Sequence, residues 1–446
     1  MSFSKTNVTE SLCPVCLARI MGEMIMEGDD LFLVKQCPDH GIFKTIIWHS
    51  SPDPAGWSRQ KGVVRSKSPY PGGEKGCPFD CGICSKHRQE SCTILIEVTS
   101  RCNLSCTYCF ANSGVRDTSD PTIQELSSRF RNAMKKSGPH NIVQLSGGEP
   151  TMRNDLPEVI AVGRDAGFPL IQLNTNGVRL ATDPAYALEL KRAGLFSVFL
   201  QFDGTDDRIN HAIRGRGLLQ QKLKSIENCA AVGLGVVLVP TVVKDINSDD
   251  IGAILKLALE YAPAVRGVHF QPAAYFGRHP EPPPPESRFT LPDLMRAIQE
   301  QTGGLIRADQ FVPPGCEHPF CSFHGNFLRQ TDGSLKPLSK QASGCCDSEP
   351  ENFGTGKAVS YMANQWAAPK PVSCCAVKDS LDAFLEDHRS NTFAISAMAF
   401  QDIWNLDLER VQECCIHVAV DDERMVPFCL YNLTSAEGTP LYRNRQ

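Results

Sequence analysis

Three cysteines on one short loop are the residues whose spacing most clearly allows chemistry. Cys102, Cys106 and Cys109 form a C-x3-C-x2-C loop directly after an apolar segment of strand length, 93–99. Three thiolates at this spacing can bind three irons of a cubane iron–sulfur cluster and leave its fourth iron without a protein ligand. An open iron can coordinate the polar groups of a small molecule. A zinc knuckle and buried free thiols are the alternative interpretations.

The loop and a glycine-rich segment after the next strand, SGGEP at 146–150, together resemble the signature of the radical S-adenosylmethionine (SAM) superfamily over about residues 93–310. The resemblance implies a 4Fe-4S cluster whose open iron binds SAM, and reductive cleavage of SAM to a 5'-deoxyadenosyl radical, chemistry that belongs to the cofactor. Glycines there let the backbone approach the ligand closely. The residues that the resemblance assigns to SAM binding are Tyr108, Gly147, Gly148, Glu149 and Pro150.

Further polar side chains follow the next two expected strands. Asn174 and Asn176 end one, and Gln201 and Asp203 end the other. In the family that the loop resembles, such positions contact SAM or substrate. The alternative is that these residues only cap the strand ends and form turns.

Arg214 lies after the fourth strand, and it is similar to a recurrent arginine of the family. An arginine at this place can pair with a carboxylate through two parallel hydrogen bonds. A surface ion pair is the alternative.

The elements that must position these residues alternate along the chain. Expected strands are 93–99, 141–147, 170–175, 197–202, 236–242 and 265–271, and expected helices are 122–136, 156–166, 184–193, 218–231 and 249–261. Near-continuous apolar strands separated by helices indicate a parallel sheet covered on its outside. We therefore predict an α/β fold, a partial (β/α)6 TIM-like barrel with its chemistry at the carboxyl ends of the strands. The expected domains are a cysteine-rich region at 1–92, the barrel at 93–310 and a second cysteine-rich region at 311–446.

The first cysteine-rich region contains two short knuckles. Cys13 and Cys16 form one, and Cys37 with His40 forms the other. Two turns that each offer two ligands are typical of a tetrahedral mononuclear metal site. With His40 as fourth ligand the site suits zinc, whereas a rubredoxin-like iron needs another cysteine. The sequence leaves the metal open.

A second C-x3-C-x2-C loop precedes the barrel. Cys77, Cys81 and Cys84 form it, and Cys92 follows eight positions later. Four cysteines can close an auxiliary cluster, and no glycine-rich segment follows this loop as it follows the first. We expect an electron-transfer or structural cluster here.

The whole run of cysteine motifs is similar to the tetraether lipid synthase branch, also described as class D radical SAM methylases acting on pterins. Members of that branch carry several iron–sulfur clusters and a mononuclear metal, so the resemblance implies one or two auxiliary 4Fe-4S clusters besides the SAM-binding one. In the last third of the chain we expect a cluster at Cys316, Cys321, Cys415 and Cys429. The vicinal pairs 345–346 and 374–375 depart from the lipid enzymes and put a lipid substrate in doubt.

Composition limits the partners. The chain has 446 residues, a formal net charge of −5 and no block of Lys or Arg, which argues against nucleic acid. Its twenty cysteines accompany no secretory signal and no transmembrane stretch, so we expect a cytoplasmic protein with reduced, metal-binding thiols. Expected partners are a small-molecule or lipid-like substrate and a flavodoxin- or ferredoxin-type reductant.

The leading hypothesis is a radical SAM enzyme that abstracts hydrogen from an unactivated carbon and then forms a carbon–carbon bond or transfers a one-carbon unit. Radical modification of a peptide or protein is a second hypothesis. A non-catalytic iron–sulfur protein that carries electrons or senses redox state is the third, and the intact segment 146–150 argues against it.

Overall fold

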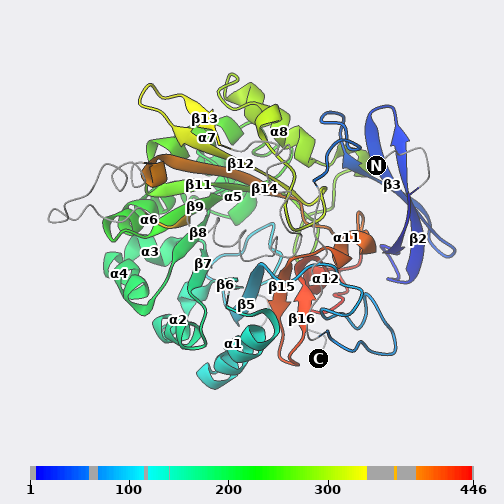
Figure 1. Cartoon of the computed structure of the whole chain (residues 1–446), viewed down its shortest axis with the longest axis horizontal. Coiled ribbons are helices and arrows are strands. Elements are labelled where there is room, and N and C mark those ends of the chain that lie inside the picture. The colour runs from blue at the N-terminus through cyan, green and yellow to red at the C-terminus, as the bar shows by residue number, and fades with distance from the viewer. Residues whose placement is uncertain are drawn as a thin grey trace, which may run out of the picture.

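The computed structural model describes residues 7–59, 69–114, 119–139, 141–338, 366–368 and 388–443. Its described strands form two sheets, one of four strands and one of twelve (Figure 1). The small sheet lies at one side of the molecule and contains the first residues that the structure describes. The large sheet contains the predicted barrel.

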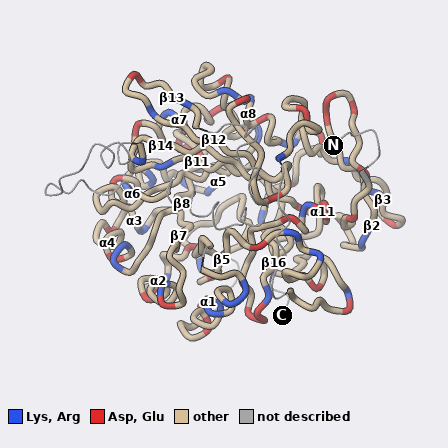
Figure 2. Tube along the Cα trace, viewed as in Figure 1, with Lys and Arg blue, Asp and Glu red and all other residues tan. Residues whose placement is uncertain are grey.

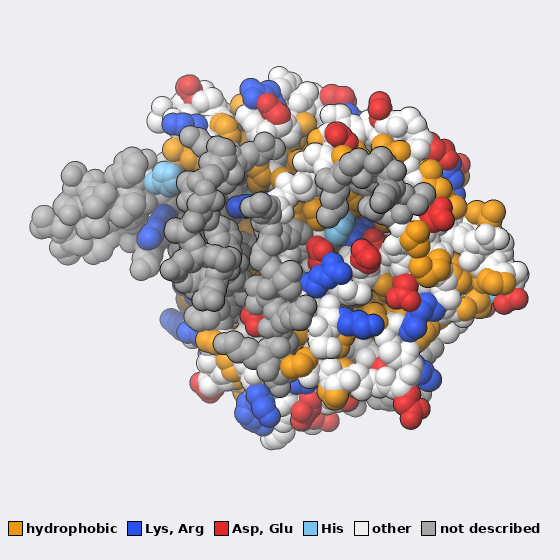
Figure 3. Space-filling view, turned by 45° about the vertical axis from the view of Figure 1, so that its right-hand side comes forward, with side chains coloured by type: hydrophobic (Ala, Val, Ile, Leu, Met, Phe, Trp, Pro, Cys, Tyr) orange, Lys and Arg blue, Asp and Glu red, His pale blue; other side chains and the backbone are white. Residues whose placement is uncertain are grey.

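The small sheet is an antiparallel meander in the order β1-β2-β3-β4. Its strands are Asn7–Leu12, Arg19–Glu27, Asp30–Cys37 and Gly41–Trp48. The first residues of β2 alternate between exposed and buried, because successive side chains of a strand point to opposite faces. The outward face keeps the exposed apolar side chains Val8, Met21 and Ile42. Exposed hydrophobic side chains are also visible at the right-hand side of the molecule in Figure 3.

Six parallel strands form the centre of the large sheet, in the order β11-β9-β8-β7-β6-β5. They are β5 (Thr93–Thr99), β6 (Ile142–Gly147), β7 (Leu170–Thr175), β8 (Ser197–Gln201), β9 (Gly235–Val239) and β11 (Val265–Pro272). The short β10 (Thr241–Val242) pairs with β11. The predicted strand 236–242 is divided because Pro240 has no N–H to donate to a neighbouring strand.

Helices cover the outer face of these strands (Figure 1). The expected ones are α1 (Ile123–Ser137), α2 (Leu156–Asp165), α4 (Pro184–Ala193), α6 (Leu219–Ala231) and α7 (Ile251–Glu260). Three more were not expected from the sequence, namely α3 (Val178–Thr182), α5 (Asp207–Arg214) and α8 (Leu291–Gln301). The core between strands and helices consists of fully buried aliphatic and aromatic side chains such as Ile96, Leu145 and Phe130. The predicted α/β fold with a partial barrel is confirmed.

The last part of the chain extends the barrel sheet at both edges. β14 (Thr392–Met398) runs parallel to β11 and is followed by β12 (Ser322–Arg329) and β13 (Leu335–Pro337). At the other edge, β15 (Ile416–Ala419) runs parallel to β5 and pairs with β16 (Met425–Pro427). The short helices α11 (Leu408–Gln412) and α12 (Phe428–Asn432) flank β15 and β16. Strands of the predicted third region therefore lie in the same sheet as the barrel.

Within the described ranges, charged residues of both signs are interspersed, without a long stretch of one sign (Figure 2). None of the helices in the described ranges combines the length and the apolarity that a membrane crossing requires.

Candidate functional site

One cavity of about 710 Å³ is lined by the barrel strands, by the loops at their carboxyl ends and by residues of β12, β14 and β15. Cys102, Cys106 and Cys109 line it together. So do most of the predicted SAM contacts, namely Tyr108, Gly147, Gly148, Glu149, Asn174, Asn176, Gln201 and Arg214. The fold thus brings together side chains from four strand ends, as predicted for a barrel.

The glycine-rich segment is held against the cysteine loop by backbone hydrogen bonds. The Gly148 N–H donates to the Thr99 carbonyl and the Glu149 N–H to the Arg101 carbonyl, each at 2.8 Å. A Cβ atom on Gly148 would lie 2.1 Å from the Arg101 oxygen, which is far inside contact distance. Glycine is required here because the segment passes directly against the backbone that leads into the cysteine loop.

Glu149 is buried and its carboxylate has a fixed orientation. One oxygen accepts hydrogen bonds from Thr151 and from the Thr175 hydroxyl at 2.7 Å, and the other accepts the Asn176 N–H at 2.7 Å. Asn176 in turn donates its side-chain amide to Asn103 in the cysteine loop at 2.7 Å. The acidic group, the end of β7 and the cysteine loop therefore form one connected unit.

Arg214 is buried and makes a two-fold ion pair. Its Nε and Nη2 donate to the two oxygens of Asp203, each at 2.6 Å, and Asp203 also accepts the Thr241 N–H at 3.0 Å. The charge of Arg214 holds the pKa of Asp203 below its ordinary value despite burial. Asp203 is not among the described residues that line the cavity. Its carboxylate instead orients Arg214, which does line it.

Two residues that the sequence did not indicate also fix the cysteine loop. The backbones of Arg278 and Cys109 exchange hydrogen bonds at 2.8 and 2.9 Å, and the Arg278 Nε donates to the Cys106 carbonyl at 2.7 Å. Gly277 has a positive φ of 68°, and a Cβ there would lie 2.4 Å from the Cys109 carbonyl oxygen. The sequence signal that could have indicated these two residues is a glycine followed by an arginine shortly after β11.

The chemistry of the cavity residues suits an iron–sulfur cluster bound by the three cysteines and a small ligand such as SAM beside it. Burial, together with the negative charges of Glu149 and the other two cysteines, raises the pKa of Cys102 to about 12. A cationic iron core removes this penalty, since thiolates are the species that bind iron. The Asn174 Oδ1 at the same cavity is a buried acceptor without a hydrogen-bond partner, which suits a ligand that donates.

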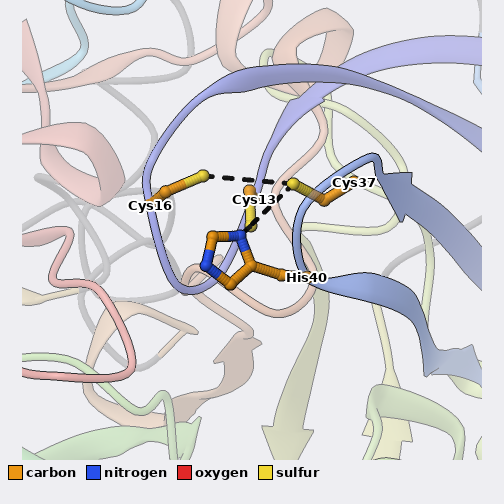
Figure 4. A group of neighbouring side chains, drawn as sticks. All are labelled: Cys13, Cys16, Cys37 and His40. Atoms are coloured by element: carbon orange, nitrogen blue, oxygen red, sulfur yellow. Dashed lines mark hydrogen bonds between the residues drawn. The ribbon is translucent and has the colours of Figure 1, made fainter.

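Cys13, Cys16, Cys37 and His40 form a second, closed metal-type site on the N-terminal sheet (Figure 4). The Sγ atoms of Cys13 and Cys37 lie 3.7 and 3.5 Å from the His40 Nδ1, and the Sγ atoms of Cys16 and Cys37 lie 4.0 Å apart. Tetrahedral zinc with ordinary ligand distances requires separations of about 3.5–3.8 Å. The contact with His40 lowers the pKa of Cys37 to about 7, which favours the thiolate that a metal binds.

The remaining described cysteines are arranged differently from the grouping that their spacing suggested. Cys77 and Cys81 share a hydrogen bond, and the neighbouring charges of Cys84 and Cys414 help to raise the pKa of Cys81. Cys92, expected with the first three, lies against Cys415 with 3.0 Å between the Sγ atoms. The reason is the parallel pairing of β5 with β15, which the sequence did not indicate.

The predicted C-terminal set is likewise divided. Cys316 hydrogen-bonds with Cys415, whereas Cys321 lies near Cys429 and accepts a hydrogen bond from Arg410 at 3.4 Å. Whether each set binds a cluster stays a prediction. The pairs 345–346 and 374–375 lie outside the described residues.

Comparisons with known proteins agree with this geometry. The family model "Radical SAM superfamily" matches residues 96–258, and the model "HMPTM N-terminal zinc ribbon domain" matches residues 6–49. The 7,8-dihydro-6-hydroxymethylpterin dimethyltransferase of Methanocaldococcus jannaschii is 34% identical, over 95% of this chain and 93% of that protein. The chain belongs to the radical SAM superfamily.

Other similar members of the superfamily share a smaller part of this chain. A GTP 3',8-cyclase of Clostridium botulinum is 26% identical over 64% of this chain and 92% of its own length. A mycofactocin maturase of Mycolicibacterium smegmatis is 28% identical over 40% of this chain and 44% of its own length. This radical SAM protein therefore resembles the pterin dimethyltransferase along nearly its whole length, including both cysteine-rich regions.

Membership has direct consequences for the cofactors. A radical SAM domain implies a 4Fe-4S cluster and SAM, so these two predictions are confirmed. The match to a zinc ribbon confirms additional metal binding and, of the two metals that the sequence left open, favours zinc. Of the two activities associated with the predicted branch, the similar full-length relative has the pterin activity rather than the lipid one.

Proposed function

We propose that this radical SAM protein is a methyltransferase that adds carbon units to a small heterocycle of the pterin class. The observation that carries the proposal is the end-to-end similarity to a pterin dimethyltransferase at 34% identity. The cavity supports it, because about 710 Å³ lies within the usual range of about 300–1,000 Å³ for small-molecule sites.

The cavity wall suits a neutral, hydrogen-bonding ring. Gln144, Gln271 and Asn326 line it with uncharged donors and acceptors. Burial lowers the pKa of His269 to about 4, so this imidazole is neutral and bonds to Ser396 at 2.8 Å. Amide and imidazole groups can pair with the nitrogen and oxygen atoms of a heterocycle, which an aliphatic chain does not offer.

Within the proposal, Cys102, Cys106 and Cys109 hold the SAM-binding cluster. A 4Fe-4S cluster carrying SAM supplies, after one-electron reduction, an oxidant that takes a hydrogen atom from carbon. Glu149 is oriented to accept the ammonium group of SAM, and the backbone of Gly147 and Gly148 leaves space for it.

Other residues of the chain orient the ligands and exclude water. Arg214, held by Asp203, offers a cation to a carboxylate, and Asn174 offers an acceptor. Arg278 ties the cysteine loop to the end of β11 and so fixes one wall of the cavity. A flavodoxin- or ferredoxin-type protein is the proposed source of electrons.

The test is an anaerobic assay with reconstituted protein, dithionite, 7,8-dihydro-6-hydroxymethylpterin and SAM that carries a deuterated methyl group. We expect 5'-deoxyadenosine together with a pterin whose mass has increased by labelled carbon units. Cys106→Ala should remove both products. Cys229→Ala is the matched control, because Cys229 is a buried cysteine in α6 that does not line the cavity, and it should retain them. SAM cleavage without methylated pterin would refute the substrate class.

A further inference from the structure

Lys222 is a buried lysine behind the SAM site. It lies in α6 with 1% of its surface exposed, and it is not among the described residues that line the cavity. Its Nζ donates to the carbonyl oxygen of Asn176 at 3.0 Å and to that of Gln201 at 2.5 Å. Asn176 directly follows β7 and Gln201 ends β8, so one amine joins the carboxyl ends of two neighbouring strands.

Asn176 is the residue through which Lys222 can act on a ligand. Its N–H donates to a Glu149 oxygen at 2.7 Å, and its side-chain amide donates to Asn103 of the cysteine loop at 2.7 Å. Its side-chain oxygen accepts the Val178 N–H at 3.0 Å, and its carbonyl accepts the amine of Lys222. Because these groups belong to one residue, a shift of the carbonyl also shifts the N–H that orients Glu149.

The second carbonyl belongs to a residue that lines the cavity itself. Gln201 reaches the cavity from β8, and Glu149 reaches it from the segment after β6. β7 lies between these two strands and runs parallel to both. A single donor between the ends of β7 and β8 therefore fixes the spacing of side chains on both sides of the cavity.

The charge of Lys222 suits its surroundings. A buried ammonium group is costly unless it is hydrogen-bonded and lies near opposite charge. Burial lowers the pKa of Lys222 to about 8, and the nearby cation of Arg214 adds to this shift. The negative charges of Asp203, Cys106 and Glu149 oppose it. The amine therefore carries its proton at pH 7 and partly balances the acidic side of the site.

Two neutral side chains of α6 make similar contacts farther along the chain. Ser225 donates to the Gly177 carbonyl at 2.5 Å, and the side-chain amide of Asn228 donates to the Leu180 carbonyl at 2.8 Å. Residues three apart are neighbours on a helix surface, so these contacts continue the row that begins at Lys222. Neutral groups thus hold α3 against α6, whereas the cation lies where two strand ends meet the cavity.

We propose that Lys222 is a positioning residue of the SAM site, which holds the Asn176 and Gln201 carbonyls and thereby aligns Glu149 with the amino group of SAM. Lys222 does not touch the ligand. This role rests on the proposed contact between Glu149 and SAM, and it is independent of the pterin substrate.

The test compares two ligands on full-length, anaerobically reconstituted protein without reductant, so that no turnover occurs. One ligand is SAM and the other is the SAM analogue that lacks the amino group, and equilibrium dialysis gives both dissociation constants. Lys222→Met keeps a long unbranched side chain but removes the donors. It should weaken SAM binding about tenfold, near the lower end of the cost of losing a hydrogen bond to a charged group, and change analogue binding less than about twofold.

A double variant separates positioning from a general structural role. Glu149→Gln should also weaken binding of SAM and not of the analogue. Adding Lys222→Met to Glu149→Gln should then weaken SAM binding by less than about a further twofold, because substitutions within one connected unit are not additive. A purely structural role of Lys222 would make the two losses add.

Asn228→Ala is the matched control. It frees a carbonyl on the same helix that has no link to Glu149, and it should leave the preference for SAM over the analogue unchanged. Iron and zinc are measured per chain in every variant. If Lys222→Met contains less metal than the wild type, Lys222→Gln replaces it with the same expectation, because its shorter polar side chain does not reach both carbonyls.

Three results would overturn the proposal. One is equal weakening of SAM and analogue binding by the substitution at Lys222, and another is full additivity in the double variant. The third is a Glu149→Gln protein that binds SAM as the wild type does, since Lys222 would then have no amino-group contact to align. The pterin assignment is decided separately by the methylated product, so the failure of one does not imply the failure of the other.

Discussion

The ion pair between Asp203 and Arg214 gives the sharpest stability prediction. Asp203→Asn keeps the size of the side chain but removes its charge and places an NH2 group against one of the guanidinium donors. Arg214 would then be a buried cation without its counter-ion, beside a second buried cation at Lys222. Removing one partner of a buried pair costs about 3–5 kcal/mol.

The lower part of this range is expected, because burial has already lowered the pKa of Lys222 to about 8 and this group can release its proton. Folding lowers the pKa of Asp203 below its value of about 3.9 in the unfolded chain. The ionised carboxylate therefore stabilises the fold above that pH, and its contribution to stability is complete at pH 7. Measurements at pH 7 therefore report the full effect.

The assay is hydrogen exchange of the amides in α5, read by mass spectrometry, since it reports local stability without assuming two-state unfolding of the whole chain. A loss of about 3 kcal/mol corresponds to about 140-fold faster exchange. Asp206→Asn is the matched control. Asp206 forms an ion pair with the exposed Arg208 and is the N-cap of the same helix, α5. Because Asn caps a helix as well as Asp does and an exposed ion pair contributes little, we expect the control to destabilise α5 by less than about 1 kcal/mol and to accelerate its exchange less than about fivefold. Equal acceleration by both substitutions would refute the reasoning.

Three further predictions concern the glycine-rich segment, the ribbon and a titrating pair. Gly148→Ala should weaken SAM binding at least tenfold in equilibrium dialysis, because its Cβ would meet the Arg101 carbonyl. Cys37→Ser should lower zinc from one to below one per chain and reduce the melting temperature, since a closed zinc site contributes directly to folding. The hydrogen bond to Asp293 raises the pKa of His49, so this pair stabilises the fold below pH ~6.5 and the contribution is lost as pH rises through the raised value.

Controls for these predictions are available in the same chain. Gly56→Ala introduces only ordinary contacts and should leave SAM binding unchanged. A Cys229→Ser variant should keep its zinc, because Cys229 lies in α6 and is not one of the four grouped ligand residues. The loss of the His49–Asp293 contribution should appear as a fall in melting temperature between pH 6 and 8, and His49→Gln should remove this fall. If the fall persists in that variant, another group causes it.

The barrel was predictable because its strands are near-continuous apolar runs separated by helical patterns. Each of the six expected strands has a counterpart within two residues, apart from the interruption at Pro240. The small sheet was missed although β2 alternates visibly, since the cysteines on both sides of it suggested turns. The helix α8 was missed although Thr290 and Asp293 form a capping box at its start.

The candidate site was predictable where it depends on local spacing and not where it depends on distant pairing. The cysteine loop and the glycine-rich segment each follow a strand, so their meeting follows from a parallel sheet. Cys92 and Cys415 are 323 positions apart, and no local pattern indicates that their strands pair. Asp203 was expected to contact a ligand because a polar residue at a strand end looks the same whether it faces the cavity or a buried arginine.

Because β5 pairs with β15, its outer edge stays without a neighbouring strand until the end of the chain has been synthesised. β5 is the first barrel strand to be made, but its outer neighbour follows about 320 residues later. At about 5–20 residues per second, the ribosome needs about 16–65 s to deliver β15. During this time one edge of β5 has no partner from the described sheet and exposes unpaired backbone groups. We therefore expect the yield of folded protein to depend strongly on chaperones that protect nascent chains, and to rise when translation is faster or temperature is lower.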